Sequence, residues 1–85
     1  MPFVVLIPKR VEKQITTLPT DVVERVLLIL GSLANNPFPQ NSKKLKNRNG
    51  YRLRIGEYRI IYEINENEKS IIILRVAHRK DVYKK

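Results

Sequence analysis

Hydrophobic residues change their spacing repeatedly along this chain, and each change predicts a new element. An apolar, β-branched run over residues 3–7 lies between two prolines, which predicts a strand. Apolar residues then recur at helical spacing from Pro8 until Pro19 interrupts them, which predicts a short amphipathic helix. Thr20 is a suitable N-cap for a second helix, whose wide apolar stripe ends before Pro37.

The second half of the chain predicts a basic loop followed by three strands. Residues 38–50 have no sustained periodicity and are expected to form the loop. Residues 51–55 and 58–64 alternate between the two faces of a strand, and Gly56 suits the first position of a two-residue type II′ turn between them. Residues 71–77 predict a last strand before a charged tail. The expected fold is α+β, in the order β-α-α-β-β-β, with two N-terminal helices packed on one face of a small, mostly antiparallel twisted sheet.

The predicted hairpin sorts its side chains onto two faces, because side chains alternate along a strand. The face expected under the helices carries Tyr51, Leu53, Ile55, Tyr58, Ile60 and Tyr62. The other face carries Arg52, Arg54 and Arg59, with Arg54 directly opposite Arg59. Like charges in that position destabilise a sheet unless an anion lies between them. The pattern therefore favours an anion site, although ordinary solvated arginines on a wet sheet face remain an alternative.

Composition narrows the class of protein. Eighty-five residues allow a single domain, expected to span residues 1–85. The first 42 residues hold four basic and three acidic groups, net +1, and the last 43 hold thirteen and five, net +8, so an anionic partner is expected to bind the second half. The absence of cysteine suits a reducing cytoplasm, and no apolar run is long enough to cross a membrane. With His78 as the sole histidine, we expect neither a metal nor a cofactor.

The anionic partner most consistent with this pattern is RNA. Arginine offers a planar set of donors that suits phosphate oxygens, but it does not readily move protons. A ribonuclease without a metal needs groups that exchange protons near the phosphate, and the tail offers His78 and Tyr83. Both could equally be structural, His78 as an ordinary residue after a strand and Tyr83 as a ring anchoring the C-terminus.

These motifs together resemble the RelE/ParE toxin superfamily along nearly the whole chain. The shared features are the leading strand, Leu18-Pro19, Asn36-Pro37, Lys44-Leu45-Lys46, Tyr51-Arg52-Leu53-Arg54, Gly56-Glu57-Tyr58-Arg59-Ile60-Ile61-Tyr62 and His78-Arg79-Lys80-Asp81-Val82-Tyr83. The last two motifs are the most specific, and their spacing in a chain of this length carries the resemblance.

The resemblance implies a RelE-like fold and a cytoplasmic, ribosome-dependent endonuclease that cleaves mRNA in the ribosomal A site. Its implied partners are the ribosome, including 16S rRNA, and an antitoxin protein whose helix covers the active-site elements; the toxin would be a monomer or part of a toxin–antitoxin hetero-oligomer. The implied catalytic residues are Arg54, Arg59, His78, Arg79 and Tyr83. The expected RNA-binding residues are Lys43, Lys44, Lys46, Arg48, Arg52 and Lys80.

The chain departs from the family pattern at two places. Arg52 and Arg54 stand where RelE-type toxins often carry lysines, and the segment between Arg79 and Tyr83 is shorter than in some relatives. Proton transfer would then fall to His78 or Tyr83. Two alternatives stay open from sequence: a ParE-like toxin that poisons gyrase by binding, and a non-catalytic module of the same fold that binds RNA or an antitoxin.

Overall fold

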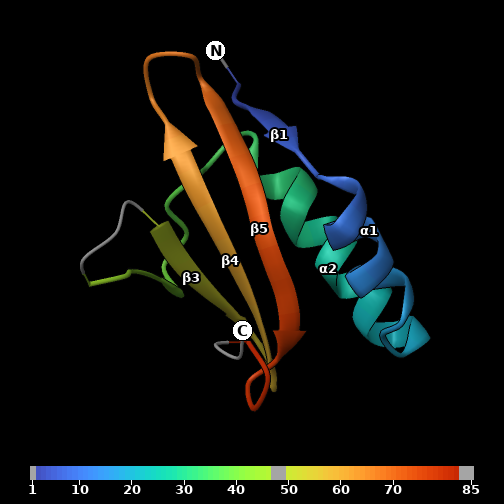
Figure 1. Ribbon diagram of the computed structural model, residues 1–85. Helices are drawn as coiled ribbons and strands as arrows, with labels where there is room; N and C mark the ends of the chain where they lie inside the picture. The colour runs from blue at the N-terminus through green and yellow to red at the C-terminus, as the bar shows by residue number, and fades with distance from the viewer. Residues whose placement is uncertain (1, 47–49, 83–85) are drawn as a thin grey trace.

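The computed structural model describes residues 2–46 and 50–82, which fold into two layers (Figure 1). The elements in chain order are β1 (Val4–Leu6), α1 (Lys9–Thr16), α2 (Thr20–Leu33), β2 (Ser42–Lys44), β3 (Gly50–Ile55), β4 (Tyr58–Asn65) and β5 (Ser70–His78). The two helices form one layer of the molecule, and the sheet forms the other. The predicted α+β class and the mostly antiparallel sheet are confirmed.

The sheet has five strands in the order β1-β5-β4-β3-β2. β1 pairs with β5 in parallel, and the other pairs are antiparallel. After β1 the chain forms both helices and then β2, β3 and β4, and β5 finally fits between β4 and β1, running in the same direction as β1. The sheet thus joins the two ends of the chain, and its most basic strands, β3 and β2, lie together at the side away from β1.

Two sequence predictions are wrong in detail. Residues 42–44 form the edge strand β2 where a loop was expected, because their backbone pairs with β3; three residues are too few to show a periodicity. Thr20 is the first residue of α2 and not its cap. Pro19 holds the N-cap position with an extended backbone (φ −56°, ψ 148°), and its carbonyl accepts the Val23 N–H at 2.9 Å.

The core lies between the helices and one face of the sheet. Val26 and Leu30 of α2 are buried there beside Leu53 and Ile60 of the β3–β4 hairpin. The hairpin register is the predicted one, from Tyr51 opposite Tyr62 to Ile55 opposite Tyr58. Gly56 has φ +57°, and the next residue does not share a positive φ, which is the type II′ combination. The turn residue therefore sets which side chains face the core.

Tyr62 is the largest fully buried side chain of this core. Its ring stacks on Tyr51 at a centroid distance of 5.8 Å, and Phe38 meets Tyr51 edge-on at 5.4 Å. The Tyr62 hydroxyl donates a hydrogen bond to the Pro37 carbonyl at 3.0 Å. These contacts tie the segment between α2 and β2 to the centre of the sheet.

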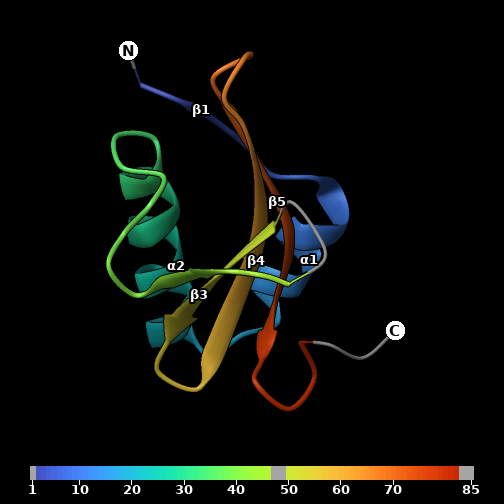
Figure 2. The same ribbon diagram turned by 90° about the vertical axis from the view of Figure 1, so that its left-hand side faces the viewer.

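The tail turns back over the sheet face that the helices leave open. After β5, the N–H groups of Asp81 and Val82 both donate to the His78 carbonyl. Val82 is 3% exposed and Ile61 5%, yet neither belongs to the core cluster under the helices. Figure 2 shows the described part of the tail and α2 on opposite sides of the sheet. We call this second side, away from the helices, the open face.

Candidate functional site: an arginine cluster on the open face

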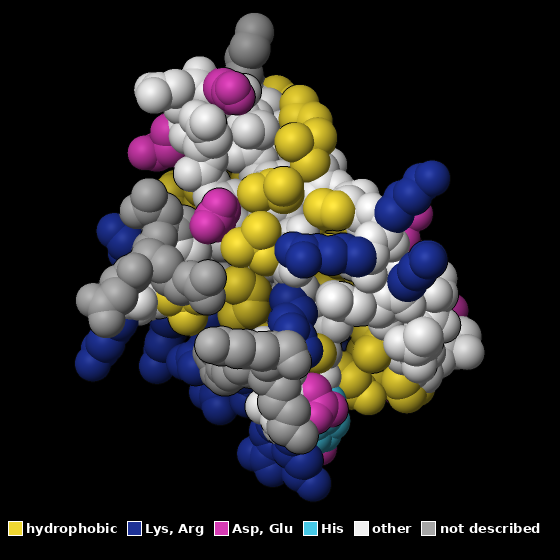
Figure 3. All heavy atoms as spheres, in the orientation of Figure 1, with side chains coloured by type: hydrophobic (Ala, Val, Ile, Leu, Met, Phe, Trp, Pro, Cys, Tyr) yellow, Lys and Arg dark blue, Asp and Glu magenta, His cyan; other side chains and the backbone are white. Residues whose placement is uncertain are grey.

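Three arginines lie together on the open face, as the hairpin register predicts. Arg54 of β3 is directly opposite Arg59 of β4, and Arg52 lies two residues from Arg54 on the same face. Arg54 is exposed, and Arg52 is half-buried. In Figure 3, basic side chains gather toward the end of the open face that carries the β3–β4 turn. The cluster concentrates positive charge on one side of a thin sheet.

Arg59 is the most constrained member of the cluster. It is only 8% exposed, and its Nη1 donates to the carbonyls of Gly56 and Tyr58, both at 2.9 Å. These two carbonyl acceptors fix the plane of the guanidinium group. Arg59 thus contributes a rigid positive charge beside the more exposed Arg54.

The lysines of β2 divide between the two sides of the sheet. Lys43 pairs with Arg52, so it extends the arginine cluster to the sheet edge. Lys44 pairs with Tyr51, which faces the helices, so Lys44 points to the other side. Of the two, only Lys43 is therefore placed beside the arginines.

The other predicted RNA-binding lysines are exposed. Lys46 follows β2, and Lys80 lies in the turn after β5. The predicted residues Arg48 and Tyr83 lie outside the part of the chain that the structure describes. The roles expected for those two side chains remain predictions.

Arg75 of β5 also lies on the open face, and the sequence analysis did not select it. β5 pairs Arg75 with Ile61 but Ile73 with Tyr62, so Leu74 is an additional residue, a β-bulge. Simple alternation from the buried Ile71 and Ile73 would have placed Arg75 under the helices. The bulge reverses the alternation, so Val76 is buried against α1 and Arg75 faces outward. No sequence signal marks this bulge.

Arg79 and the β3–β4 turn are tied together at the end of the sheet. The Arg79 N–H donates to the Glu57 carbonyl at 2.7 Å, and Arg79 Nη2 lies 3.8 Å from Glu57 Oε1. Both side chains are more than half exposed, so the ion pair is weak and its main effect is to orient Arg79. Because the turn also positions Arg54 and Arg59, this contact relates Arg79 to the cluster.

His78 lies on the helix side of the sheet. It pairs with Tyr58, and the two rings meet edge-on at 5.3 Å. The Lys80 N–H donates to Nδ1 at 3.2 Å, so Nδ1 carries no proton, and Nε2–H points at Glu57 Oε2, also at 3.2 Å. A neutral imidazole satisfies both contacts. The structure therefore separates His78 from Arg54 and Arg59, which occupy the other face.

The charge distribution on the open face has two ends. The hydrogen bond from His78, followed by the nearby charge of Arg79, lowers the pKa of Glu57, so that carboxylate stays ionised.

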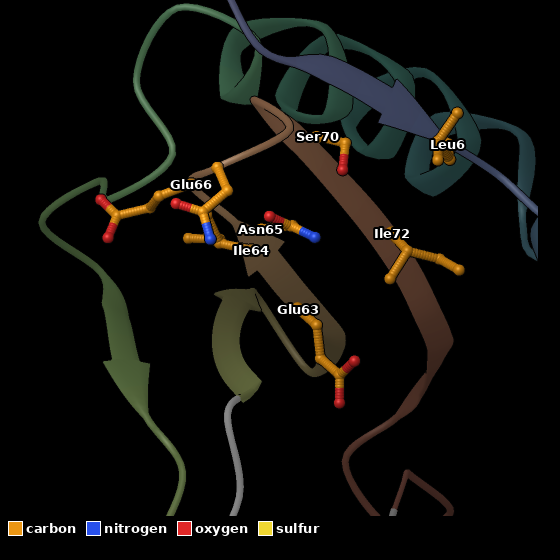
Figure 4. Close-up of a pocket in the computed structure, with 8 residues that line it drawn as sticks. Leu6, Glu63, Ile64, Asn65, Glu66, Ser70 and Ile72 are labelled. Carbon is orange, nitrogen blue, oxygen red and sulfur yellow. The ribbon is translucent and has the colours of Figure 1, made fainter.

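Toward the β4–β5 turn lies a groove of about 610 Å³ (Figure 4). Its lining includes Glu63 and Glu66, and Ile72 forms part of its apolar wall. Two carboxylates disfavour phosphate there, which leaves the arginine end as the anion-binding end.

The cluster can bind and polarise a phosphate, but its guanidinium groups do not exchange protons readily. Among residues 2–46 and 50–82, no three His, Cys, Asp or Glu side chains come close enough together to hold a metal ion. None of the described helices has the length and apolarity needed to span a bilayer.

Comparison with known proteins gives a consistent family. Residues 5–83 match the family described as "ParE toxin of type II toxin-antitoxin system, parDE". Toxin RelE3 of Methanocaldococcus jannaschii is 37% identical over 84 residues, which cover 93% of each chain. A chain of the RelE–RelB complex from Pyrococcus horikoshii superposes with a TM-score of 0.85 at 33% identity, covering 96% of this chain and all of that one. A chain of the RelB–RelE antitoxin–toxin complex from Methanococcus jannaschii gives 0.77 at 34% identity, covering 93% and 95%.

These matches span nearly the whole chain and agree with the motifs around the β3–β4 turn and the tail. They also agree with the order of helices and strands. The resemblance identified from sequence is therefore confirmed: the protein belongs to the RelE/ParE superfamily of toxins from type II toxin–antitoxin systems.

Proposed function

We propose that this toxin acts as a RelE-type endoribonuclease that cleaves mRNA on the ribosome, in the cytoplasm and without a metal ion. The observation that supports this most directly is the gathering of Arg52, Arg54 and Arg59 on the open face of the sheet, with Arg54 exposed. Charged groups of one sign, held by a rigid sheet, are already arranged for an anion before it binds. The similarity to RelE toxins supports mRNA as that anion.

In the proposed reaction, the ribose 2′-hydroxyl gives up its proton as its oxygen bonds to the adjacent phosphorus. The bond from phosphorus to the 5′-oxygen breaks, and that oxygen takes up a proton, which leaves a cyclic phosphate and a free 5′-hydroxyl. Arg52 and Arg54 bind the non-bridging phosphate oxygens, and the rigid Arg59 stabilises the charge that grows in the transition state. Arg79 stabilises the leaving oxygen. The surrounding basic side chains of the second half, including Lys43, contact phosphates of the message or of ribosomal RNA.

Proton transfer is assigned to Tyr83 in this proposal. His78 faces Tyr58 on the helix side, and both of its ring nitrogens already have partners. Those contacts favour a role in orienting Arg79 and the turn over one in exchanging protons with substrate. Tyr83 directly follows Val82 in the sequence, and Val82 is buried on the open face.

An antitoxin of the RelB type is the proposed regulatory partner. The similar P. horikoshii and M. jannaschii structures are toxin–antitoxin complexes. An acidic segment laid over Arg52, Arg54 and Arg59 would neutralise charges that repel one another in the free toxin. Such a segment would inhibit the enzyme by occupying the phosphate site.

Primer extension on a translated message tests the proposed activity. Wild-type protein should produce cuts phased with codons, and Arg54→Gln or Arg79→Gln should reduce them strongly while circular dichroism shows a retained fold. Arg10→Gln on the exposed side of α1 is the matched control, because it removes the same charge away from the open face. Equal cutting by Arg54→Gln and Arg10→Gln would refute the assigned phosphate site.

The family match to ParE toxins supports a second candidate, a toxin that binds gyrase. Such a protein needs no phosphate-cleaving site. A supercoiling assay separates the two: stalled gyrase with intact message supports the ParE-like activity, and cut message with normal supercoiling supports the ribonuclease.

A further inference from the structure

Arg75 occupies a position that completes the arginine cluster. One row across the open face runs from Lys43 through Arg52 and Ile61 to Arg75. Adjacent strands are about 4.8 Å apart, so Arg52 and Arg75 lie roughly 10 Å apart on either side of Ile61. Both side chains are long enough to reach the space above Ile61. Arg75 thus faces Arg52 across an apolar floor.

The guanidinium group of Arg75 is only partly satisfied within the described residues. Its Nη2 donates to the Asp81 carbonyl at 2.9 Å, which fixes the side chain under the tail. Its Nε atom is buried and has no hydrogen-bond acceptor among the described residues. A buried charged donor without an acceptor is unfavourable, so the Asp81 carbonyl satisfies only part of the hydrogen-bonding capacity of this guanidinium group.

Among residues 2–46 and 50–82, no carboxylate forms an ion pair with Arg75. Glu63 lies two residues from Ile61 on the same face of β4, yet Arg75 forms no ion pair with it or with any other described residue. The carbonyl of Asp81 supplies an acceptor but no full negative charge. Arg75 is half-buried and not fully enclosed, so its charge can act on an anion bound at the surface beside Arg52.

We propose that Arg75 is a further phosphate-binding residue of this toxin, whose charged guanidinium group attracts an RNA phosphate at the surface beside Arg52 while its Nη2 holds the tail in place. The inference rests on the proposed ribonuclease function and adds a residue to its RNA site. The bulge at Leu74 is what makes this role available, because it turns Arg75 from the core side to the open face. RNA binding and tail placement are thereby coupled through one side chain.

The test measures binding of a short, labelled single-stranded RNA as a function of salt concentration. Neutralising one phosphate contact should lower the slope of log affinity against log salt by about 0.7 for a single strand. Arg75→Gln should show this loss together with an affinity about tenfold lower, a difference of about 1.4 kcal/mol. Arg75→Lys should keep the slope and lose part of the affinity, because it retains the charge but not the planar guanidinium group.

Arg10→Gln is the control for net charge, and it should leave the slope unchanged because α1 carries it away from the open face. Thermal unfolding of each variant separates loss of fold from loss of binding. If Arg75→Gln and Arg10→Gln bind RNA equally well at every salt concentration, Arg75 only anchors the tail and the inference is wrong.

If the proposed ribonuclease function is wrong, a different assay shows it. In that case wild-type protein would leave ribosome-bound message uncut in the primer-extension assay. The salt-dependence comparison still decides the role of Arg75, because it measures binding and requires no cleavage. Wild-type protein that binds no RNA at low salt would overturn the inference directly.

Discussion

The buried hydroxyl of Tyr62 gives a prediction with two separate signatures. Tyr62 is 0% exposed, and its hydroxyl donates to the carbonyl of Pro37, which is itself a buried residue. Tyr62→Phe keeps the ring and its stacking but leaves that carbonyl without the hydroxyl donor. An unsatisfied buried acceptor costs about 1–3 kcal/mol, so the variant should be less stable at neutral pH by about that amount.

The second signature is the pH dependence of this difference. Burial raises the pKa of Tyr62 above its usual 10.0, with a smaller opposing effect from a hydrogen bond with Ser42. A group whose pKa is raised on folding contributes its full stabilisation below the unfolded pKa and loses it as the pH rises through the folded pKa. The stability difference between wild type and Tyr62→Phe should therefore be constant below pH 10.0 and shrink above it.

Urea unfolding followed by circular dichroism, at several pH values, measures both signatures. For a domain of this size, each 1 kcal/mol also lowers the melting temperature by about 4–8 °C. Tyr58→Phe is the matched control: Tyr58 is half-buried at the rim, so it should change stability little. Equal stability of Tyr62→Phe and wild type at neutral pH would show that the bond to Pro37 contributes nothing.

Three further predictions concern the turn and the open face. Gly56→Ala should destabilise the protein by about 1–2 kcal/mol in urea unfolding, because φ is +57° there and an added Cβ would meet only ordinary contacts with Arg25; an unchanged midpoint would contradict the type II′ turn. Glu57→Gln should speed proteolysis of the tail at neutral pH. Since the pKa of Glu57 is lowered, wild type should acquire the same sensitivity only as the pH falls below 4.5, and identical proteolysis profiles would refute this contact. Arg54→Gln should reduce the salt slope of RNA binding by about 0.7, and a slope equal to that of Arg10→Gln would exclude Arg54 from the site.

Local sequence determined the hairpin and the arginine pair. Gly56 permits the turn, and the turn fixes the register, so strict alternation places Arg54 opposite Arg59 and Tyr62 in the core. Helix positions also followed from sequence, since apolar spacing and Pro19 act within a few residues. The motifs of the hairpin and the tail were then enough to identify the family.

Tertiary structure decided what depends on pairing between distant segments. β2 is a strand only because β3 offers it hydrogen bonds, and Arg75 faces outward only because β5 bulges against β4. His78 lies on the helix side for the same reason, since the bulge reverses the alternation before the end of β5. A bulge changes the phase of a strand without changing its composition, so side chains beyond it can be assigned to a face only after the partner strand is known.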